Sequence, residues 1–190
     1  MNNNNQYNDL LIYTPPRQRG LIDATIKWKR FDPNAILPTK RWTDAGFDVY
    51  ALSAPIVIEP HTTKLIPTGL GCRVSPGFWA FAVDRGSTGS IGLHTHCGVI
   101  DEEYTGEIFI ALHNDRDIPV VITSSVDKLT YKTNEIGQTV ALWYPVTKGI
   151  AQIVVMPRYN VDSSEISDEE WDEFVAASQR GTSKLGQSGK

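Results

Sequence analysis

The chain has 190 residues, a formal net charge of −4 and a hydrophobic content of 41%. One domain of this length can bury a sizeable core, and the charge provides no basic field that would gather nucleic acid. No apolar stretch approaches the roughly 18 residues of a membrane span, and residues 1–9 lack the pattern of a signal peptide. Cys72 and Cys97 make no disulfide framework. We therefore expect an intracellular, cytoplasmic protein that contacts neither nucleic acid nor membrane.

Short apolar runs separated by eleven prolines and fifteen glycines favour an all-β chain with many turns. Residues 1–20 are polar, and we expect them to form an N-terminal extension without a core. Residues 21–160 are expected to form one β domain. Its predicted strands are 25–31, 44–51, 56–58, 64–67, 71–74, 78–83, 91–96, 119–123, 140–144 and 150–156.

Residues 85–90, Arg-Gly-Ser-Thr-Gly-Ser, directly follow a predicted strand. A glycine-containing loop in that position exposes backbone N–H groups that can cradle phosphate oxygens. Ser87 and Thr88 add hydroxyl donors, and Arg85 adds a planar cation. The absence of a Gly-Lys-Ser/Thr ending excludes a Walker loop. The pattern indicates a phosphate-binding loop, with an ordinary polar loop as the alternative.

Residues 98–107, Gly-Val-Ile-Asp-Glu-Glu-Tyr-Thr-Gly-Glu, place three consecutive carboxylates between two apolar runs. Strand signals on both sides predict a β-hairpin with an acidic tip that can reach a ligand. The alternative is a surface turn that carries solvated acids.

The sequence Leu-His-Thr-His-Cys at residues 93–97 invites a metal-binding interpretation. Neighbouring residues of a strand cannot all point at one ion, however. Solvated or core-satisfied histidines at His94 and His96 are therefore favoured over a metal site with Cys97.

Three features mark the second half of the chain. Residues 124–139 are polar, and we expect an inserted hairpin or loop that is either decoration or a protein-binding surface. Residues 161–179 are expected to form an acidic linker with a short helix, since Ser167-Asp168-Glu169-Glu170 fits a capping box and apolar residues follow at helical spacing. Residues 180–190 are too polar to pack a core, so they form either a flexible arm or a disordered tail.

Five segments follow one another in order along the chain: Asp-Ala-Gly-Phe-Asp at 44–48, Arg-Gly-Ser-Thr-Gly at 85–89, the acidic stretch at 98–107, Gly-Ile-Ala-Gln-Ile at 149–153, and Arg-Gly with Gly-Gln-Ser-Gly within 180–189. In this order they resemble the motifs of the homotrimeric dUTP pyrophosphatases (dUTPases). A viral or phage-type member of that family would act in the host cytoplasm. The resemblance implies a distorted jelly roll that assembles as a homotrimer with shared sites. It also implies hydrolysis of dUTP to dUMP and pyrophosphate, which limits uracil incorporation into DNA and supplies dUMP for dTMP synthesis.

The resemblance assigns roles to residues of the acidic stretch. Asp101 matches the carboxylate that accepts a proton from the attacking water. Tyr104 matches the aromatic residue that stacks on the deoxyribose and leaves no room for a 2′-hydroxyl. Gly98 and Ile100 belong to the segment whose backbone reads the uracil edge.

The other motifs contain the residues that the resemblance assigns to binding the triphosphate. The phosphate-binding positions implied by the resemblance are Arg85, Gly86, Ser87 and Gln152. Asp48 matches a carboxylate that lies near the waters of a Mg²⁺ ion. Because Mg²⁺ prefers oxygen ligands and keeps its waters, we expect the triphosphate to hold this cofactor, with no direct protein ligand.

The C-terminal arm is expected to close over the nucleotide of a neighbouring subunit. Arg180 would pair with the γ-phosphate, and the wrapping residues would be Leu185, Gly186, Gln187 and Ser188. Closure would exclude water and strengthen the charge contacts inside.

Several positions depart from the family pattern. Gly86 replaces a serine, Gly149 replaces a basic residue, and Lys184-Leu185 replaces a glycine and an aromatic residue that covers the uracil. Leucine cannot stack as a π surface, so lid closure is expected to be weaker.

Two other readings remain open. A dCTP deaminase shares the fold, but its catalytic glutamate would fall where this chain has Ala111. A regulatory binding protein on a dUTPase scaffold would use residues 124–139 as its interaction surface.

Overall fold

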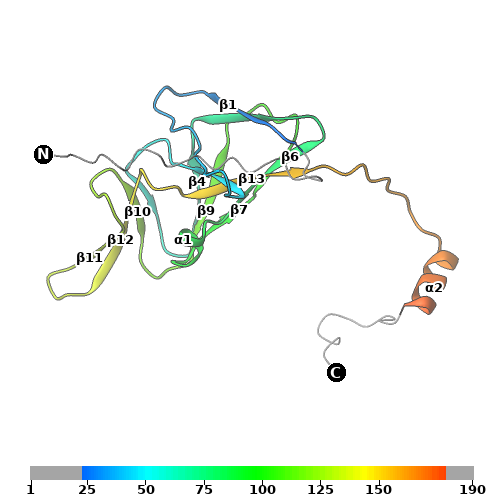
Figure 1. Ribbon diagram of the computed structural model, residues 1–190. Helices are drawn as coiled ribbons and strands as arrows, with labels where there is room; N and C mark the ends of the chain where they lie inside the picture. Colours follow the sequence, from blue (N-terminus) through cyan, green and yellow to red (C-terminus); the bar gives the residue numbers. More distant parts are fainter. Residues whose placement is uncertain (1–22, 179–190) are drawn as a thin grey trace, which may run out of the picture. The chain divides into compact units, whose positions relative to one another are not determined.

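The computed structural model describes residues 23–178, and within them the chain forms thirteen strands and two helices (Figure 1). The strands are β1 (Ile26–Arg30), β2 (Gly46–Val49), β3 (Ile56–Ile58), β4 (Thr63–Pro67), β5 (Leu70–Val74), β6 (Phe78–Val83), β7 (Leu93–His96), β8 (Val99–Ile100), β9 (Phe109–Asn114), β10 (Val120–Thr123), β11 (Thr130–Thr133), β12 (Thr139–Pro145) and β13 (Ala151–Pro157). The helices are α1 (Gly86–Gly89) and α2 (Asp168–Ala177). The predicted all-β class with a short helix near the C-terminus is confirmed.

The strands pair into four small sheets, in the orders β1-β5, β11-β12-β10-β3, β2-β13-β6-β8 and β4-β9-β7. All pairs are antiparallel except β10 with β12. Alternation decides which side chains enter the core, because successive residues of a strand face opposite sides of the sheet. In β9, for example, Ile110 and Leu112 are fully buried, whereas Phe109 is half exposed.

The predicted hairpin at residues 98–107 is wrong. β8 pairs with β6, in the register Phe81 with Val99, whereas β9 pairs with β4 and β7 in a different sheet. Gly98 explains the choice of partner: a Cβ there would lie 2.2 Å from the carbonyl oxygen of Ala82. Only glycine lets the chain approach β6 this closely, so the acidic stretch crosses between two sheets.

The expected inserted hairpin is present. β11 pairs with β12, and a turn closes them through a hydrogen bond from Gln138 N to Asn134 Oδ1 of 2.9 Å. β12 continues into the domain, where it pairs in parallel with β10. In Figure 1 the hairpin extends away from the other sheets, so its outer part is available to a partner or to a ligand.

The described chain divides into two compact units after Arg158. The second unit contains α2, and Ser167 caps the helix by accepting a hydrogen bond of 3.2 Å from Glu170 N, as the sequence predicts. No helix within residues 23–178 is long and apolar enough to cross a membrane. The predicted N-terminal extension and C-terminal arm lie outside the described residues.

Candidate active site

The centre of the candidate site is an ion pair between Arg85 and Asp48. The guanidinium donates from Nε to Asp48 Oδ1 at 2.8 Å and from Nη2 to Asp48 Oδ2 at 2.6 Å. Both side chains are largely buried, with 20% of Arg85 and 23% of Asp48 exposed. A bidentate pair in a partly desolvated place fixes the guanidinium plane. Arg85 therefore has a defined orientation before any ligand arrives.

Strand β13 and the turn before it add further contacts to this pair. Gln152 donates from Nε2 to Asp48 Oδ1 at 3.2 Å, because β13 and β2 place these residues opposite each other. The carbonyl of Gly149 accepts from Arg85 Nη1 at 2.9 Å and from the Tyr144 hydroxyl at 2.6 Å. Burial raises the pKa of Tyr144, so the phenol stays a donor. We call these five residues the phosphate cluster.

Gly149 is a glycine for a physical reason that the sequence did not reveal. A Cβ at this position would lie 3.2 Å from both Arg85 Cδ and Asp48 Cβ. A larger residue would press on the ion pair. The position that departs from the family pattern thus contributes through its carbonyl group, and a side chain there would require Arg85 or Asp48 to shift slightly.

The residues predicted as a phosphate loop instead form one turn of helix, α1, so that loop prediction is wrong in its local structure. Thr88 is fully buried, and its hydroxyl donates to Arg85 O at 2.9 Å and accepts from Arg85 N at 3.1 Å. Ser87 Oγ lies 3.4 Å from Arg85 Nη1. Gly86 faces open space, since a Cβ there would meet no atom within 4 Å. The turn therefore presents Arg85 and Ser87 together.

Asp84 was not singled out from the sequence, and it ties this turn to β7. Its carboxylate accepts from Thr95 N, and its Oδ2 lies 2.9 Å from His94 Nδ1. Partial burial alone would raise the pKa of Asp84, but the hydrogen bonds from His94 and Thr95 outweigh it and hold the pKa below its usual value. The signal available in the sequence was only an acid directly before Arg85, which is not specific.

His96 and Cys97 have separate surroundings. The ring of His96 stacks on His113, with centroids 5.1 Å apart, and Cys97 is exposed with a φ of 55°. Within residues 23–178 no group of three or more His, Cys, Asp or Glu side chains is arranged to hold a metal ion. The described histidine contacts serve the packing of β7 and β9.

The acidic turn, residues 101–107, is the second part of the candidate site. Asp101 is exposed, and within residues 23–178 no hydrogen bond or ion pair is recorded for its carboxylate. Its neighbour Glu102 is occupied, because it accepts from Gly77 N at 3.2 Å and from Arg158 Nε at 3.0 Å. Within the described residues, Asp101 and Glu103 are therefore the two exposed acids of the turn whose carboxylates can accept a proton from water.

Tyr104 is held by contacts within the acidic turn. Its backbone N–H donates to Asp101 O at 3.1 Å, and its hydroxyl donates to Glu107 O at 2.7 Å. Gly106 makes room for the ring, since a Cβ there would lie 2.6 Å from the Tyr104 oxygen. The ring is 44% exposed and can contact a ligand. Ile100 is buried, so only its backbone is available to read a base.

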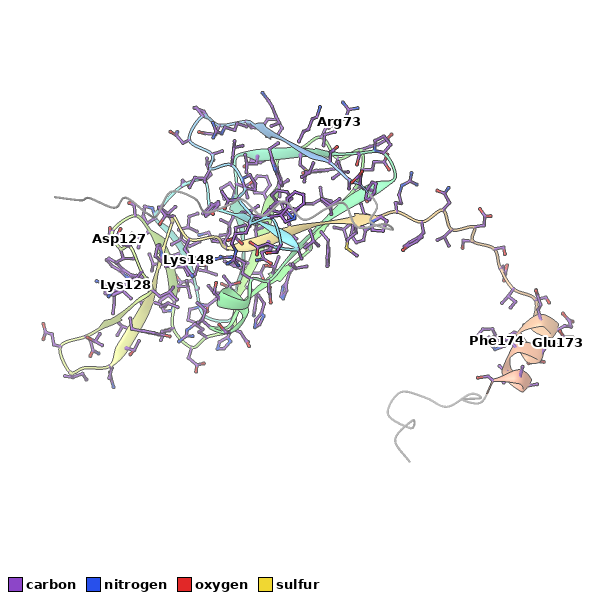
Figure 2. The ribbon with its side chains drawn as sticks, viewed as in Figure 1. Arg73, Asp127, Lys128, Lys148, Glu173 and Phe174 are labelled. Carbon is purple, nitrogen blue, oxygen red and sulfur yellow. The ribbon has the colours of Figure 1, made fainter. Side chains whose placement is uncertain are left out.

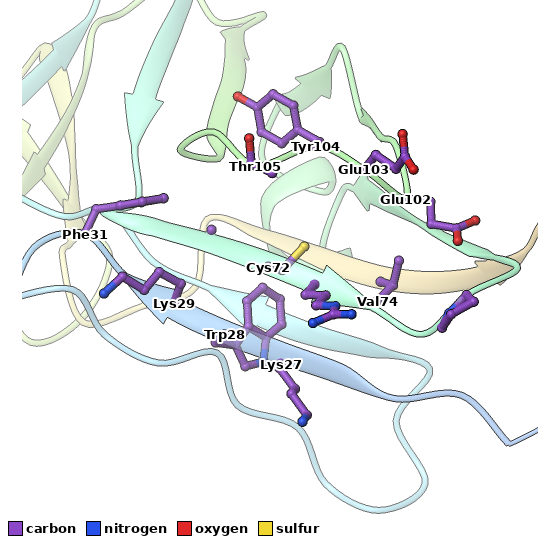
Figure 3. A pocket seen from close by; sticks show the side chains of 13 residues that line it. Lys27, Trp28, Lys29, Phe31, Cys72, Val74, Glu102, Glu103, Tyr104 and Thr105 are labelled. Carbon is purple, nitrogen blue, oxygen red and sulfur yellow. The ribbon is translucent and has the colours of Figure 1, made fainter.

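The structure does not bring the two parts together within one chain. The β6–β8 register pairs Ile100, the residue before Asp101, with Ala80, which lies five residues before Arg85; this corresponds to up to about 17 Å of extended chain. The cavities agree. One of about 600 Å³ and one of about 490 Å³ flank Arg85 and Asp48, whereas Tyr104 lines a third of about 660 Å³ with Trp28 and Cys72 (Figure 3). None of these three contains both Arg85 and the acidic turn.

An anchored arginine, a Gly-Ser-Thr turn and an exposed carboxylate on a β domain are groups that can hold phosphate and activate water, as a nucleotide-phosphate hydrolase requires. The dUTPase family profile matches residues 32–126. The deoxyuridine 5′-triphosphate nucleotidohydrolase of Azoarcus sp. (strain BH72) is 30% identical over 151 residues, which cover 77% of this chain and 83% of that protein. The chain belongs to the dUTPase family, and it hydrolyses dUTP to dUMP and pyrophosphate.

Solved structures agree on the fold. The dUTPase of Staphylococcus bacteriophage 80alpha, as a point mutant with dUpNHpp, has a TM-score of 0.65 at 23% identity and covers 87% of this chain and 99% of that chain. The dUTPase of phage phi11 of S. aureus, described with a species-specific insert, has a TM-score of 0.58 at 22% identity over 76% of this chain and 97% of that chain. The jelly-roll prediction is confirmed.

Ala111 occupies the position at which a dCTP deaminase would carry its catalytic glutamate. Ala111 lies in β9 and is buried, with 3% of its surface exposed. It offers no acid to a ligand, and the family match concerns dUTPases. The dCTP deaminase alternative is therefore set aside.

Proposed function

We propose that dUTP binds with its phosphates on Arg85, Gly86, Ser87 and Gln152 of one copy of the chain, while Asp101 of a second copy supplies the base. The observation that carries this proposal is the separation of Asp101 from Arg85 within one chain. A general base must lie within hydrogen-bond reach of the water that it activates, and that water must reach a phosphorus atom held by the phosphate cluster. The separation of the two residues therefore supports a site in which one copy supplies Arg85 and another supplies Asp101.

In the proposed reaction, water attacks the α-phosphorus and Asp101 accepts its proton. The new P–O bond replaces the bond to the β-phosphate bridging oxygen, and pyrophosphate leaves with the electron pair. Arg85 is oriented before binding by Asp48 and Gly149, so little reorganisation is needed as charge shifts onto the leaving group. Gly86 can contribute only its backbone to this site.

Recognition of deoxyuridine is assigned to the acidic turn and β8. Tyr104 would pack on the deoxyribose, because its ring is exposed while its hydroxyl is fixed on Glu107. Gly98 and Ile100 would present backbone groups to the uracil edge. The close approach of Gly98 to β6 keeps this backbone in place.

The donor set suits a Mg²⁺ ion that is held mainly by the substrate. The Asp48 carboxylate already accepts three hydrogen bonds from Arg85 and Gln152, so it would contact the ion through water. When bound, the ion neutralises phosphate charge. A mutant of the phi11 dUTPase is described with a structural Mg(II) ion, which supports a cation in relatives of this chain.

The assembly that would complete the site is a homotrimer, as in the family. Arg180 and the residues Leu185, Gly186, Gln187 and Ser188 would close over the nucleotide, although they lie outside the described residues. Removing residues 179–190 should leave dUMP binding nearly unchanged and slow dUTP hydrolysis. Leu185→Phe should strengthen closure, by an amount on the order of a stacking contact, ~0.5–1.5 kcal/mol.

Subunit complementation tests the shared site. Arg85→Ala and Asp101→Asn chains should each lose most dUTP hydrolysis when assembled alone. Co-expression of the two chains should restore pyrophosphate release, because some sites then take Arg85 from one chain and Asp101 from the other. If mixed assemblies remain as inactive as the single variants, the two residues act in the same chain and the proposal fails.

A second role, regulatory protein binding, is favoured by one observation. The β11–β12 hairpin exposes Tyr131, Ile136 and Val140, with 77% of Ile136 accessible. Phage dUTPases, among them that of phage 80alpha, are described as controlling the transfer of virulence genes, so a hairpin partner with an apolar surface is reasonable. Ile136→Asp should abolish such an association without changing dUTP hydrolysis. Equal binding of that partner by both proteins would remove the hairpin tip from this role.

A further inference from the structure

The inserted hairpin also reaches the candidate active site at its base. A cavity of about 600 Å³ lies beside the phosphate cluster, and both the cluster and the hairpin segment contribute residues to its walls. One wall holds Asp48, Arg85 and Gly149. Another holds Asp127, Lys128 and Leu129, the segment that leads into β11.

A second lysine enters the same cavity from the turn between β12 and β13. Lys148 lies directly before Gly149, and its backbone N–H donates to Pro145 O at 3.0 Å, which fixes the turn. Lys148 lines the cavity together with Arg85. Figure 2 shows Lys128 and Lys148 close together on one side of the β domain, next to Asp127.

The charges within the phosphate cluster cancel, so any net positive charge for a phosphate ligand must come from these two lysines. Asp48 neutralises Arg85 at 2.6 Å, so the ion pair by itself offers no net positive charge to a triphosphate. Within residues 23–178 no ion pair is recorded for Lys128 or Lys148. With both lysines, the cavity carries three positive charges against the two of Asp48 and Asp127.

Binding of an anionic substrate needs this local positive charge, because the formal net charge of the whole chain is −4. An anionic substrate gains no general attraction from such a protein and depends on nearby cations. An ammonium on a flexible stem serves phosphate as a mobile point charge. Gly149 carries no side chain of its own, and the neighbouring Lys148 supplies a cation to the cavity from one position earlier.

We propose that Lys128 and Lys148 bind the β- and γ-phosphates of dUTP, and the pyrophosphate product, so that the insertion is part of the active site. The inference rests on the proposed placement of the triphosphate at Arg85. It assigns to the base of the hairpin a role separate from the exposed tip. Lys128 then contributes to substrate binding, and only the outer hairpin is left for a partner.

The test compares Lys128→Ala and Lys148→Ala with Lys132→Ala in the full chain. Lys132 is the matched control, because it lies in the same hairpin, loses the same charge and packs over Trp143 with its ammonium 4.0 Å from the ring centroid, outside the cavity. KM for dUTP should rise about tenfold in each cavity variant, as expected from losing one charge-assisted hydrogen bond. Inhibition by pyrophosphate should weaken by a similar factor, whereas the affinity for dUMP should change less than about twofold.

The outcomes separate the competing explanations. If the cavity variants match Lys132→Ala in both KM and pyrophosphate inhibition, the inference is wrong. If they weaken dUMP and pyrophosphate equally, the lysines act on the α-phosphate or on the fold, and the assignment to the β- and γ-phosphates is wrong. Arg85→Ala measured in parallel reports on the proposed site itself: unchanged KM in that variant would instead overturn the placement of the triphosphate.

Discussion

The phosphate cluster and the acidic turn differ in how they are held. The phosphate cluster is cross-linked by residues from β2, the turn before α1, β12 and β13, and its ion pair is largely buried. The acidic turn is tied to neighbouring segments by Glu102, which accepts from Gly77 N and Arg158 Nε, and by Glu107, which accepts from Gly69 N, while Asp101 stays exposed. One region is fixed within a single chain, whereas the other keeps an exposed carboxylate, which the proposed function assigns to the site of a second chain.

This difference has a physical origin. Arg85 must keep one orientation in a partly buried place, so every donor that points inward needs a partner. Asp101 must give its carboxylate to water and substrate, so a strong internal partner would compete with its task. Mutations in the phosphate cluster should therefore affect binding, and mutations in the acidic turn should affect turnover or selectivity.

The largest expected effect is that of Asp101→Asn. The amide keeps the shape of the side chain but is a poor base, so kcat should fall by roughly 10²-fold or more. Because no partner of the Asp101 side chain is recorded within residues 23–178, the melting temperature should barely change. Steady-state pyrophosphate release and thermal unfolding measure the two quantities. A kcat near that of the wild type would remove Asp101 as the base.

Asp48→Ala should weaken substrate binding by the phosphate cluster. Arg85 would lose two charge-assisted hydrogen bonds and its fixed orientation, so KM for dUTP should rise by about 10- to 100-fold. Asp117→Ala is the matched control, since Asp117 pairs with the exposed His61 and lines neither of the two cavities beside Arg85. Equal KM values for the two variants would show that the orientation of Arg85 does not matter.

Tyr104→Ala should relax the rejection of UTP relative to dUTP. Without the ring, a 2′-hydroxyl gains room, and the ratio of kcat/KM for dUTP over UTP should fall by about tenfold. A ratio is informative here because the amount of folded enzyme cancels. Tyr104→Phe should keep the ratio close to that of the wild type, and an unchanged ratio in Tyr104→Ala would contradict the assignment.

The smallest expected effect is an increase in affinity for dUTP, in the variant Gly86→Ser. Gly86 faces open space, so Gly86→Ser can restore the hydroxyl that the family carries there without a steric conflict. KM for dUTP should fall by about two- to tenfold, the value of one added hydrogen bond. Gly149→Ala, in contrast, presses on Arg85 and should raise KM. An increase in KM for Gly86→Ser would show that α1 is not open to the phosphates.

Local patterns in the sequence were enough to find most strands and the capped helix at Ser167, whereas the resemblance to the dUTPases supplied the residues of both candidate regions. Alternation and turn residues act over a few positions, so they are readable without the fold. The motif residues Asp48, Arg85 and Gln152 were named from the sequence, and the structure brings them into one cluster.

The partner of β8 could not be read from local pattern. Residues 98–107 carry strand signals on both sides, and the nearest apolar run downstream was the natural choice for pairing. The close approach of Gly98 to Ala82 decided otherwise, and that contact joins residues far apart in the chain. The same holds for Asp84 with Thr95 and for Gly149 with Arg85.

The sequence by itself determined the fold class, the family and the chemical groups of the reaction, because these depend on residue types and their order. Only the tertiary structure decided that Arg85 is anchored by Asp48, that Asp101 lies apart from it in the same chain, and that Lys128 of the insertion lines the cavity beside the phosphate cluster. Those three facts depend on strand register and on distances between remote residues, which are set when the core packs.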